Sequence, residues 1–166
     1  MNAKDILTEG LGRIPDLVHT AVHDLTPDQL RWSPAPGANS IGWLVWHLTR
    51  VQDDHVADLI GDEQIYLTGD WAPRFGLKAD PSDTGYGHRP NQITQVVPES
   101  AQVLEDYYRA VHERTLSYIA GLSEADLDRV VDTAWDPPVT LGVRLVSVID
   151  DDAQHAGQAA YVRGLL

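Results

Sequence analysis

The chain of 166 residues contains no cysteine and has a formal net charge of −13. Such a length predicts one domain, residues 1–166, with a substantial core. Without cysteine, disulfide bonds, a cysteine nucleophile and thiolate metal ligands are excluded. The acidic charge argues against nucleic acid and membrane partners, because phosphate groups are repelled by such a surface.

Two features indicate a cytoplasmic location. No apolar run reaches the length needed to span a bilayer. The first residues, MNAKDILTEGLGRI, lack the basic and apolar blocks of a secretory signal. The oligomeric state stays open, with a homodimer as one option, because exposed apolar faces cannot be located from the sequence of one chain.

The first predicted helix covers residues 3–24, in which apolar side chains recur at three- and four-residue spacing. Pro15 lies inside this stretch and costs about 3 kcal/mol in a regular helix interior, so we expect a kink or a break. A short turn of helix is expected after Thr26.

A second helix is predicted over residues 40–60, with Asn39 or Ser40 as its N-cap and Gly61 as its end. Residues 62–97 then form a connection rich in glycine and proline. A connection of this length is usually functional or disordered, but disordered segments are poor in aromatic residues and this one contains several. We expect an ordered loop that crosses one end of the bundle and walls a pocket.

A third helix is predicted over residues 98–120, with Pro98 in its first turn. The pattern SEADL at residues 123–127 has the form of a capping box and predicts a short extra helix. A fourth long helix is predicted over residues 140–163, and strand signals are weak throughout. These elements favour an all-α four-helix bundle with a long ordered loop between helices 2 and 3. Another all-α arrangement is the alternative.

Histidine and aspartate occur inside segments that otherwise look like core. At about 100° per residue, His47 lies beside the apolar stripe of its helix, and His155 shares the inward stripe of the fourth helix. Asp151 and Asp152 precede His155 by four and three residues, so either carboxylate can neighbour it. A divalent metal would satisfy such a cluster. A simple Asp–His hydrogen bond, or an exposed aspartate run, explains the pattern equally well.

Three segments carry a resemblance to a known family: NSIGWLVWHLTRVQDDH, GDWAPRFGLKADPSDTGYGH and DDDAQHAGQAAYVRG. The first and third resemble the DinB/YfiT-like superfamily of small four-helix metalloproteins. The loop segment is similar to the actinobacterial branch that includes mycothiol S-transferases. Because the resemblance covers almost the whole chain, it implies the four-helix fold of that superfamily.

The resemblance also implies a metal site made by a histidine of the second helix and two residues four apart in the last long helix. The matching residues are His47, Asp151 and His155, with Asp151 where the family often has histidine. Helical phase slightly favours Asp152 as the inward carboxylate, so the choice between the two aspartates stays open. The donor atoms should lie within roughly 3–4 Å of one another around a divalent ion. Zinc is the first choice, and nickel, manganese and iron are also compatible with nitrogen and oxygen ligands.

The activity implied by the resemblance is transfer of a low-molecular-weight thiol, mycothiol or a similar one, to an electrophile. The metal would bind the thiol and present it as a thiolate. One alternative is a metal-dependent hydrolase or isomerase on the same site. The other is a non-catalytic bundle that binds a ligand or a partner. No catalytic residue beyond the metal ligands is expected.

Several further residues are candidates for contact with a substrate. Arg50 and Arg89, like Arg74 of the loop, could meet the carboxylates of an anionic substrate. Asp54 could accept a hydrogen bond from His47 and orient its ring, and a solvated aspartate is an equal alternative. His55 is expected to be structural. The candidate substrate-binding residues are Trp43, Trp71, Arg74, Tyr86 and Gln158.

Overall fold

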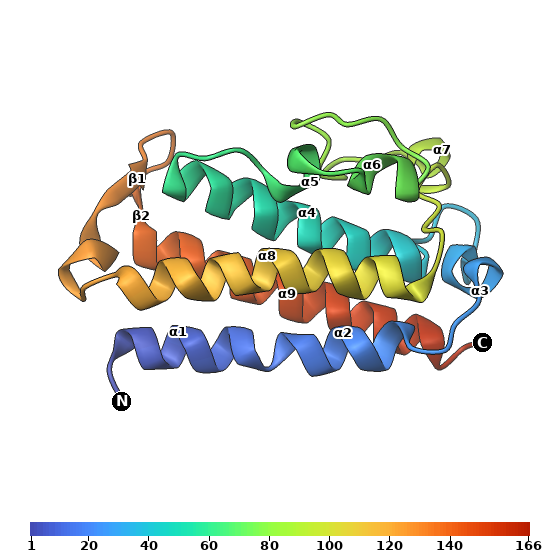
Figure 1. The fold of residues 1–166 in the computed structure, drawn as a ribbon, viewed down its shortest axis with the longest axis horizontal. Helices are drawn as coiled ribbons and strands as arrows, with labels where there is room; N and C mark the ends of the chain where they lie inside the picture. Colours follow the sequence, from blue (N-terminus) through green and yellow to red (C-terminus); the bar gives the residue numbers. More distant parts are fainter.

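The computed structural model describes residues 1–166 and shows long helices that lie side by side (Figure 1). The long helices are α4 (Ile41–Ile60), α8 (Ala101–Gly121) and α9 (Leu141–Arg163), and α1 (Ala3–Gly12) and α2 (Ile14–Val22) run end to end as the fourth. The short elements are α3 (Pro27–Arg31), α5 (Ile65–Thr68), α6 (Trp71–Arg74), α7 (Pro90–Ile93), the 3-10 helix η1 (Ala125–Asp128), β1 (Val130–Asp132) and β2 (Val139–Thr140). The predicted all-α bundle is therefore confirmed.

The first helix is broken where the sequence predicted it. Arg13 ends α1 and precedes α2, and Pro15 lies in the first turn of α2. A proline there removes no hydrogen bond, because the first N–H groups of a helix have no partner within the helix. The break therefore costs α2 little stability, and the two helices continue in the same direction.

Helix α4, which contributes to the candidate site, has clear signals at both ends. The Ser40 hydroxyl accepts a hydrogen bond from the Trp43 N–H at 3.2 Å, so Ser40 and not Asn39 is the N-cap. Gly61 ends the helix in the left-handed conformation, at φ 75°, which glycine adopts without steric cost. Both boundaries follow from the sequence.

The third long helix begins later than predicted. Ser100 caps α8 and accepts a hydrogen bond from the Val103 N–H at 3.2 Å. Pro98 lies before the helix and packs on Gly42 of α4, where a Cβ atom would come within 2.8 Å of the proline ring. The predicted start at residue 98 is wrong because this proline serves a tertiary contact and a serine two residues on supplies the cap.

A short hairpin closes the end of the bundle away from the long loop (Figure 1). Strand β1 pairs antiparallel with β2, in register with Val130 opposite Thr140. Strand signals are weak in this part of the sequence, because strands of two and three residues are too short to show alternation. The pattern SEADL does open a short helix, η1, as predicted, with the Ser123 N–H donating to the Asp126 carboxylate at 2.7 Å.

The long loop between α4 and α8 is ordered by two buried charges of α4. The Asp53 carboxylate accepts the backbone N–H groups of Ile65 and Tyr66 at 3.0 and 2.8 Å. The Arg50 guanidinium donates to the backbone carbonyls of Asp83 and Pro81 at 3.0 and 3.2 Å. Because buried charges must be satisfied by hydrogen bonds, these contacts hold the start and the middle of the loop against α4.

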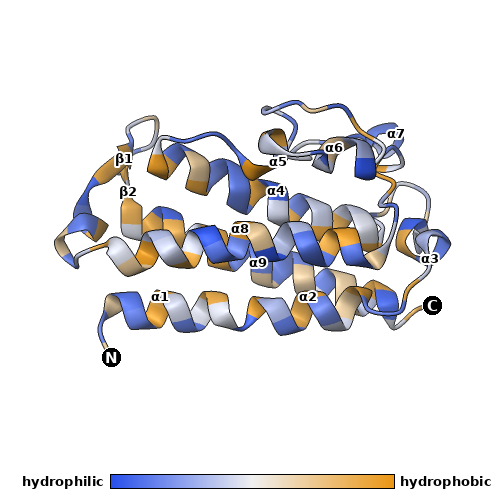
Figure 2. Cartoon of the chain, viewed as in Figure 1, coloured by the Kyte–Doolittle hydropathy of each residue, from blue (hydrophilic) through white to orange (hydrophobic).

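Hydrophobic and hydrophilic positions alternate along every long helix (Figure 2), as expected where one face of each helix is buried. A larger cluster of 24 buried residues includes Trp43, Trp46 and Tyr107, and a smaller cluster of 6 includes Leu7 and Leu141. No helix combines the length and the apolar character that crossing a bilayer requires.

Candidate metal centre

Two of the packed helices bring three potential metal ligands together. His47 lies in α4, and Asp151 and His155 lie one turn apart in α9. One donor atom from each side chain lies within 4.8 Å of the other two, a slightly wider spread than the roughly 3–4 Å expected around a shared ion. The Asp151 Oδ1 atom is 3.5 Å from His155 Nε2, and the two imidazole centroids are 4.7 Å apart.

His47 is buried and held in one tautomer. Its Nδ1 atom lies 2.5 Å from the backbone carbonyl oxygen of Thr84, which can only accept, so Nδ1 carries the proton and Nε2 keeps its lone pair. Burial lowers the pKa of His47. The neutral ring with a free Nε2 is the form that binds a metal.

The tautomer of His155 is likewise fixed, in this case by a residue of the same helix. Its Nδ1 atom lies 3.0 Å from the side-chain oxygen of Gln158, so Nδ1 donates and Nε2 faces Asp151. The pKa of His155 is raised, mainly by the hydrogen bond to Asp151. A proton and a metal ion would therefore compete for the same pair, and metal binding would weaken as the pH falls.

Asp151, one of the three candidate ligands, has an unsatisfied oxygen. Its Oδ2 atom is buried and has no hydrogen-bond partner, which is unusual for a carboxylate. Two imidazole nitrogens and a carboxylate oxygen are ordinary ligands for zinc and related divalent ions. The residues present therefore fit a divalent ion.

Asp152 lies outside this cluster. It is fully buried, both of its oxygens lack hydrogen-bond partners, and burial raises its pKa well above the ordinary value. Around the helix axis, Asp151 and Asp152 lie about 40° and 60° to opposite sides of His155. The structure brings Asp151 to His47, as the family resemblance implied. Helical phase alone cannot tell which side α4 occupies.

A cavity of about 420 Å³ opens beside the candidate ligands. Two of the three, His47 and Asp151, line it directly, so coordination positions left open by the protein would face this space. Its wall also contains Asp54, His55, Tyr86 and Ser147.

The loop reaches this cavity with residues 84–86. Thr84 and Tyr86 contribute to the wall. Gly85 passes so close to α4 that a Cβ atom would lie 2.8 Å from His47 Nδ1. The expectation that the loop walls a pocket is met by these residues and not by the aromatic residues around residue 71.

Trp43 packs on the candidate ligand His47, with ring centroids 4.6 Å apart and an interplanar angle of 16°. Its indole N–H donates to His88 Nδ1 at 3.1 Å, and His88 Nε2 in turn lies 2.8 Å from the Asp83 carboxylate. The structure thus places Trp43 as support for His47, connected through two loop residues. Neither His88 nor Asp83 was singled out in the sequence, because no periodicity relates a loop to a helix.

Trp71 and Arg74 lie away from the cavity. Trp71 packs on Tyr107 of α8, with centroids 5.2 Å apart, and the Arg74 guanidinium lies over the indole ring and pairs with Glu99 at 2.6 Å. Both side chains were expected from the sequence to line the pocket. These two side chains attach α6 to the bundle, because Trp71 packs on the aromatic core beside α8.

The expected roles of Arg50 and Asp54 are wrong. Arg50 is fully buried and uses its guanidinium on loop carbonyls and on Gln64, so it cannot meet an anionic substrate. Asp54 accepts a hydrogen bond from the Gln64 amide at 2.7 Å and lines the cavity. The carbonyl of Thr84, which no sequence pattern could reveal, orients His47 in its place.

His55 has more than the structural role expected from the sequence, because it lines the cavity. Its Nδ1 atom lies 2.7 Å from an Arg144 nitrogen. Since arginine only donates, Nδ1 accepts and the proton is on Nε2. Burial first, and then the charge of Arg144, lower the pKa of His55, so the neutral ring is favoured.

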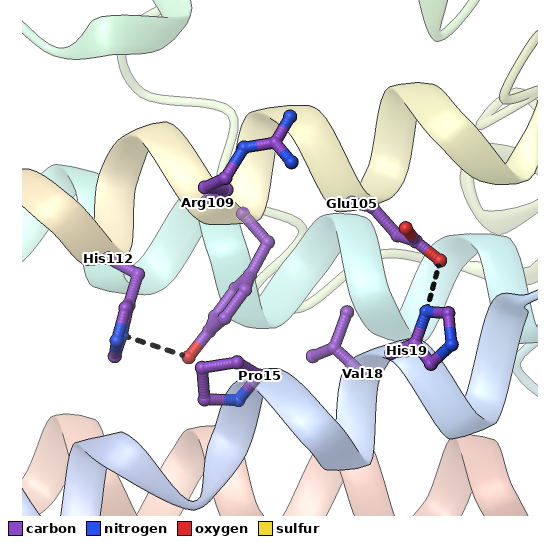
Figure 3. Close-up of a pocket in the computed structure, with 7 residues that line it drawn as sticks. Pro15, Val18, His19, Glu105, Arg109 and His112 are labelled. Atoms are coloured by element: carbon purple, nitrogen blue, oxygen red, sulfur yellow. Dashed lines mark hydrogen bonds and ion pairs between the residues drawn. The ribbon is translucent and has the colours of Figure 1, made fainter.

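A smaller cavity of about 160 Å³ lies between α2 and α8 (Figure 3). His112 and Tyr108 face it, with the tyrosine hydroxyl 3.4 Å from His112 Nδ1, and His19 pairs with Glu105 at 3.0 Å. None of the three candidate metal ligands lines this cavity. It is therefore separate from the candidate metal centre.

Comparison with known proteins agrees with this fold. Residues 11–159 match the DinB superfamily, and the chain belongs to this superfamily. The chain is also similar to a solved structure described as that of a conserved protein of locus from Enterococcus faecalis. The two are 34% identical, with a TM-score of 0.90, over 98% of this chain and 96% of that chain. No curated protein matches the chain.

Proposed function

We propose that the protein is a metal-dependent thiol S-transferase, which joins a low-molecular-weight thiol such as mycothiol to an electrophilic small molecule. The observation that supports it most is the convergence of His47, Asp151 and His155 beside a cavity of about 420 Å³. Three protein ligands leave coordination positions open, which is the pattern of catalytic metal sites and not of structural ones.

The chain's own residues would have separate roles in this reaction. His47 and His155 would hold a divalent ion through Nε2, and Asp151 through its carboxylate. An ion held in this way lowers the pKa of a thiol and favours the thiolate, the nucleophilic form. The cavity wall would hold the electrophile next to the sulfur, and such proximity supplies several kcal/mol of barrier reduction, of the order of 7–11 kcal/mol in well-oriented cases.

Other features of the chain are compatible with thiol transfer. It contains no cysteine, so no thiol of its own would compete for the metal. Zinc suits the donor set best, and nickel, manganese or iron are also compatible with it. A cytoplasmic location follows from the proposal, because thiols are kept reduced in that compartment.

Metal analysis and a thiol assay test the proposal together. Protein purified without an affinity tag would be analysed for bound metal and then mixed with a low-molecular-weight thiol and a reactive electrophile. We expect bound metal and catalysed thiol consumption, both lost in His155→Ala and both kept in the control His19→Ala, which changes an exposed histidine. Bound metal without thiol consumption would favour a hydrolase or isomerase. Absence of metal would favour a non-catalytic binding bundle.

A further inference from the structure

The cavity beside the candidate metal centre carries an uneven charge. Two carboxylates line it, those of Asp54 and Asp151, and no arginine or lysine does. Asp151 would be neutralised by the ion that it binds. Asp54 would not, because it lies two helical turns from His47 and outside the ligand set.

One carboxylate oxygen of Asp54 is free to accept hydrogen bonds. One of its oxygens, Oδ1, accepts from the Gln64 amide at 2.7 Å, and Oδ2 has no partner within the protein. A carboxylate with an unused oxygen in a cavity wall attracts hydrogen-bond donors and cations, and it repels anions.

The arginines that contact residues of this wall or of the loop beside it are bound by other groups of the protein. Arg144 donates to Asp132 at 2.9 Å and to His55 at 2.7 Å. Arg50 is buried and bound to loop carbonyls. His55, between Arg144 and the cavity, accepts at Nδ1 and presents a neutral ring. No free cation is therefore available to bind an acidic substrate in this space.

We propose that Asp54 selects the thiol cosubstrate by charge, so that the cavity admits cationic and uncharged thiols and excludes acidic ones. This inference rests on the proposed thiol transfer and narrows it to a class of cosubstrate. The chain's net charge of −13 acts in the same direction, because a negative field lowers the local concentration of anions.

Three small thiols provide the test, cysteamine, 2-mercaptoethanol and 3-mercaptopropionate, which share a thiol on two methylene groups and carry a cationic, a neutral and an anionic terminal group. The protein would be loaded with Co²⁺, and binding would be followed by the sulfur-to-cobalt charge-transfer absorption, which does not require turnover. We expect the ratio of cysteamine affinity to mercaptopropionate affinity to fall about tenfold in Asp54→Asn. Dividing the ratio of the parent by that of the variant cancels the intrinsic difference between the two thiols.

The matched control is Asp58→Asn, which removes the same charge from an exposed position one turn along α4. We expect a much smaller change there, because solvent screens an exposed charge. In the parent protein, added salt should also reduce the preference for cysteamine. An equal effect of both variants, or a ratio unchanged by Asp54→Asn and by salt, would overturn the role of Asp54 while leaving thiol transfer intact. Co²⁺ binding without a charge-transfer band for any thiol would overturn the thiol proposal itself, and this inference with it.

Discussion

The backbone carbonyl of Thr84 lies 2.5 Å from Nδ1 of His47, so a residue of the long loop fixes the tautomer of a candidate metal ligand in α4. The loop in turn is held by Arg50, which donates to the carbonyl of the adjacent residue, Asp83, at 3.0 Å. A residue that contacts a ligating histidine in this way typically contributes about 10- to 100-fold to metal affinity. Metal binding should therefore depend on the loop as well as on the helices.

Gly85→Ala tests this dependence. The new methyl group would meet His47 Nδ1 at 2.8 Å and the Trp46 ring at 2.9 Å, so the loop or the imidazole must move. We expect metal affinity, measured by competition with a chromophoric chelator, to fall about 10- to 100-fold.

Gly87→Ala is the matched control for that variant. Gly85 and Gly87 both have positive φ, at 87° and 74°, but a Cβ atom on Gly87 would meet nothing within 4 Å. Both variants therefore share the backbone strain of alanine in the left-handed region, and only Gly85→Ala disturbs the histidine. Equal metal affinities for the two variants would show that the Thr84 carbonyl is unimportant.

Gln158→Leu should weaken metal binding through the other histidine. It removes the oxygen that lies 3.0 Å from His155 Nδ1, and the ring would lose the contact that orients it. We expect an affinity loss of about tenfold or more. Gln154→Leu is the control, because Gln154 lies one turn earlier on α9 and bonds to Asp150 instead. A normal affinity in Gln158→Leu would assign this glutamine to the surface.

Asp53→Asn should destabilise the fold strongly. The carboxylate is fully buried and accepts from Tyr107 and Arg114, both at 2.8 Å, in addition to its two loop N–H groups. Breaking a buried ion pair leaves an uncompensated charge and costs about 3–5 kcal/mol. Urea denaturation would measure the loss, and the exposed Asp62→Asn should change the free energy of unfolding by no more than about 0.5 kcal/mol. Similar stabilities for the two variants would be inconsistent with Asp53 as the anchor of the loop.

His112 should make the protein less stable in mild acid. Burial lowers the pKa of this imidazole in the folded protein, and the opposing charge of Glu113 has a smaller effect. As the pH falls below about 6.5, the unfolded chain binds a proton that the folded chain resists, so stability is lost until the folded pKa is passed. The free energy of unfolding, measured with chelator present, should therefore fall less between about pH 7 and pH 5 in His112→Gln. Parallel pH profiles for the two proteins would contradict a buried neutral His112.

The helices could be predicted because their signals are local. Pro15, Ser40 and Gly61 each act within one turn of a helix end, and apolar spacing marks the buried faces. The start of α8 was missed because Pro98, which looks like a first-turn residue, packs instead on Gly42 of another helix. Such a contact cannot be recognised from spacing along one chain.

The candidate site likewise contains some residues that the sequence could predict and others that it could not. His47, Asp151 and His155 lie on helices whose phase or family resemblance indicates that they converge. Thr84 contacts His47 through a backbone carbonyl, a group that every residue has, so the sequence carries no signal for it. Trp71 was placed at the pocket because aromatic residues favour pockets as well as cores, and the structure packs it on Tyr107.

Titration with Co²⁺ tests the central claim that His47, Asp151 and His155 form one metal centre. The visible absorption of bound Co²⁺ reports both its stoichiometry and its nitrogen and oxygen ligands. We predict one Co²⁺ per chain in the parent protein and in the control His19→Ala, and loss of the bound ion in His47→Ala and in His155→Ala. Undiminished binding in both ligand variants, or no binding by the parent, would contradict the metal centre.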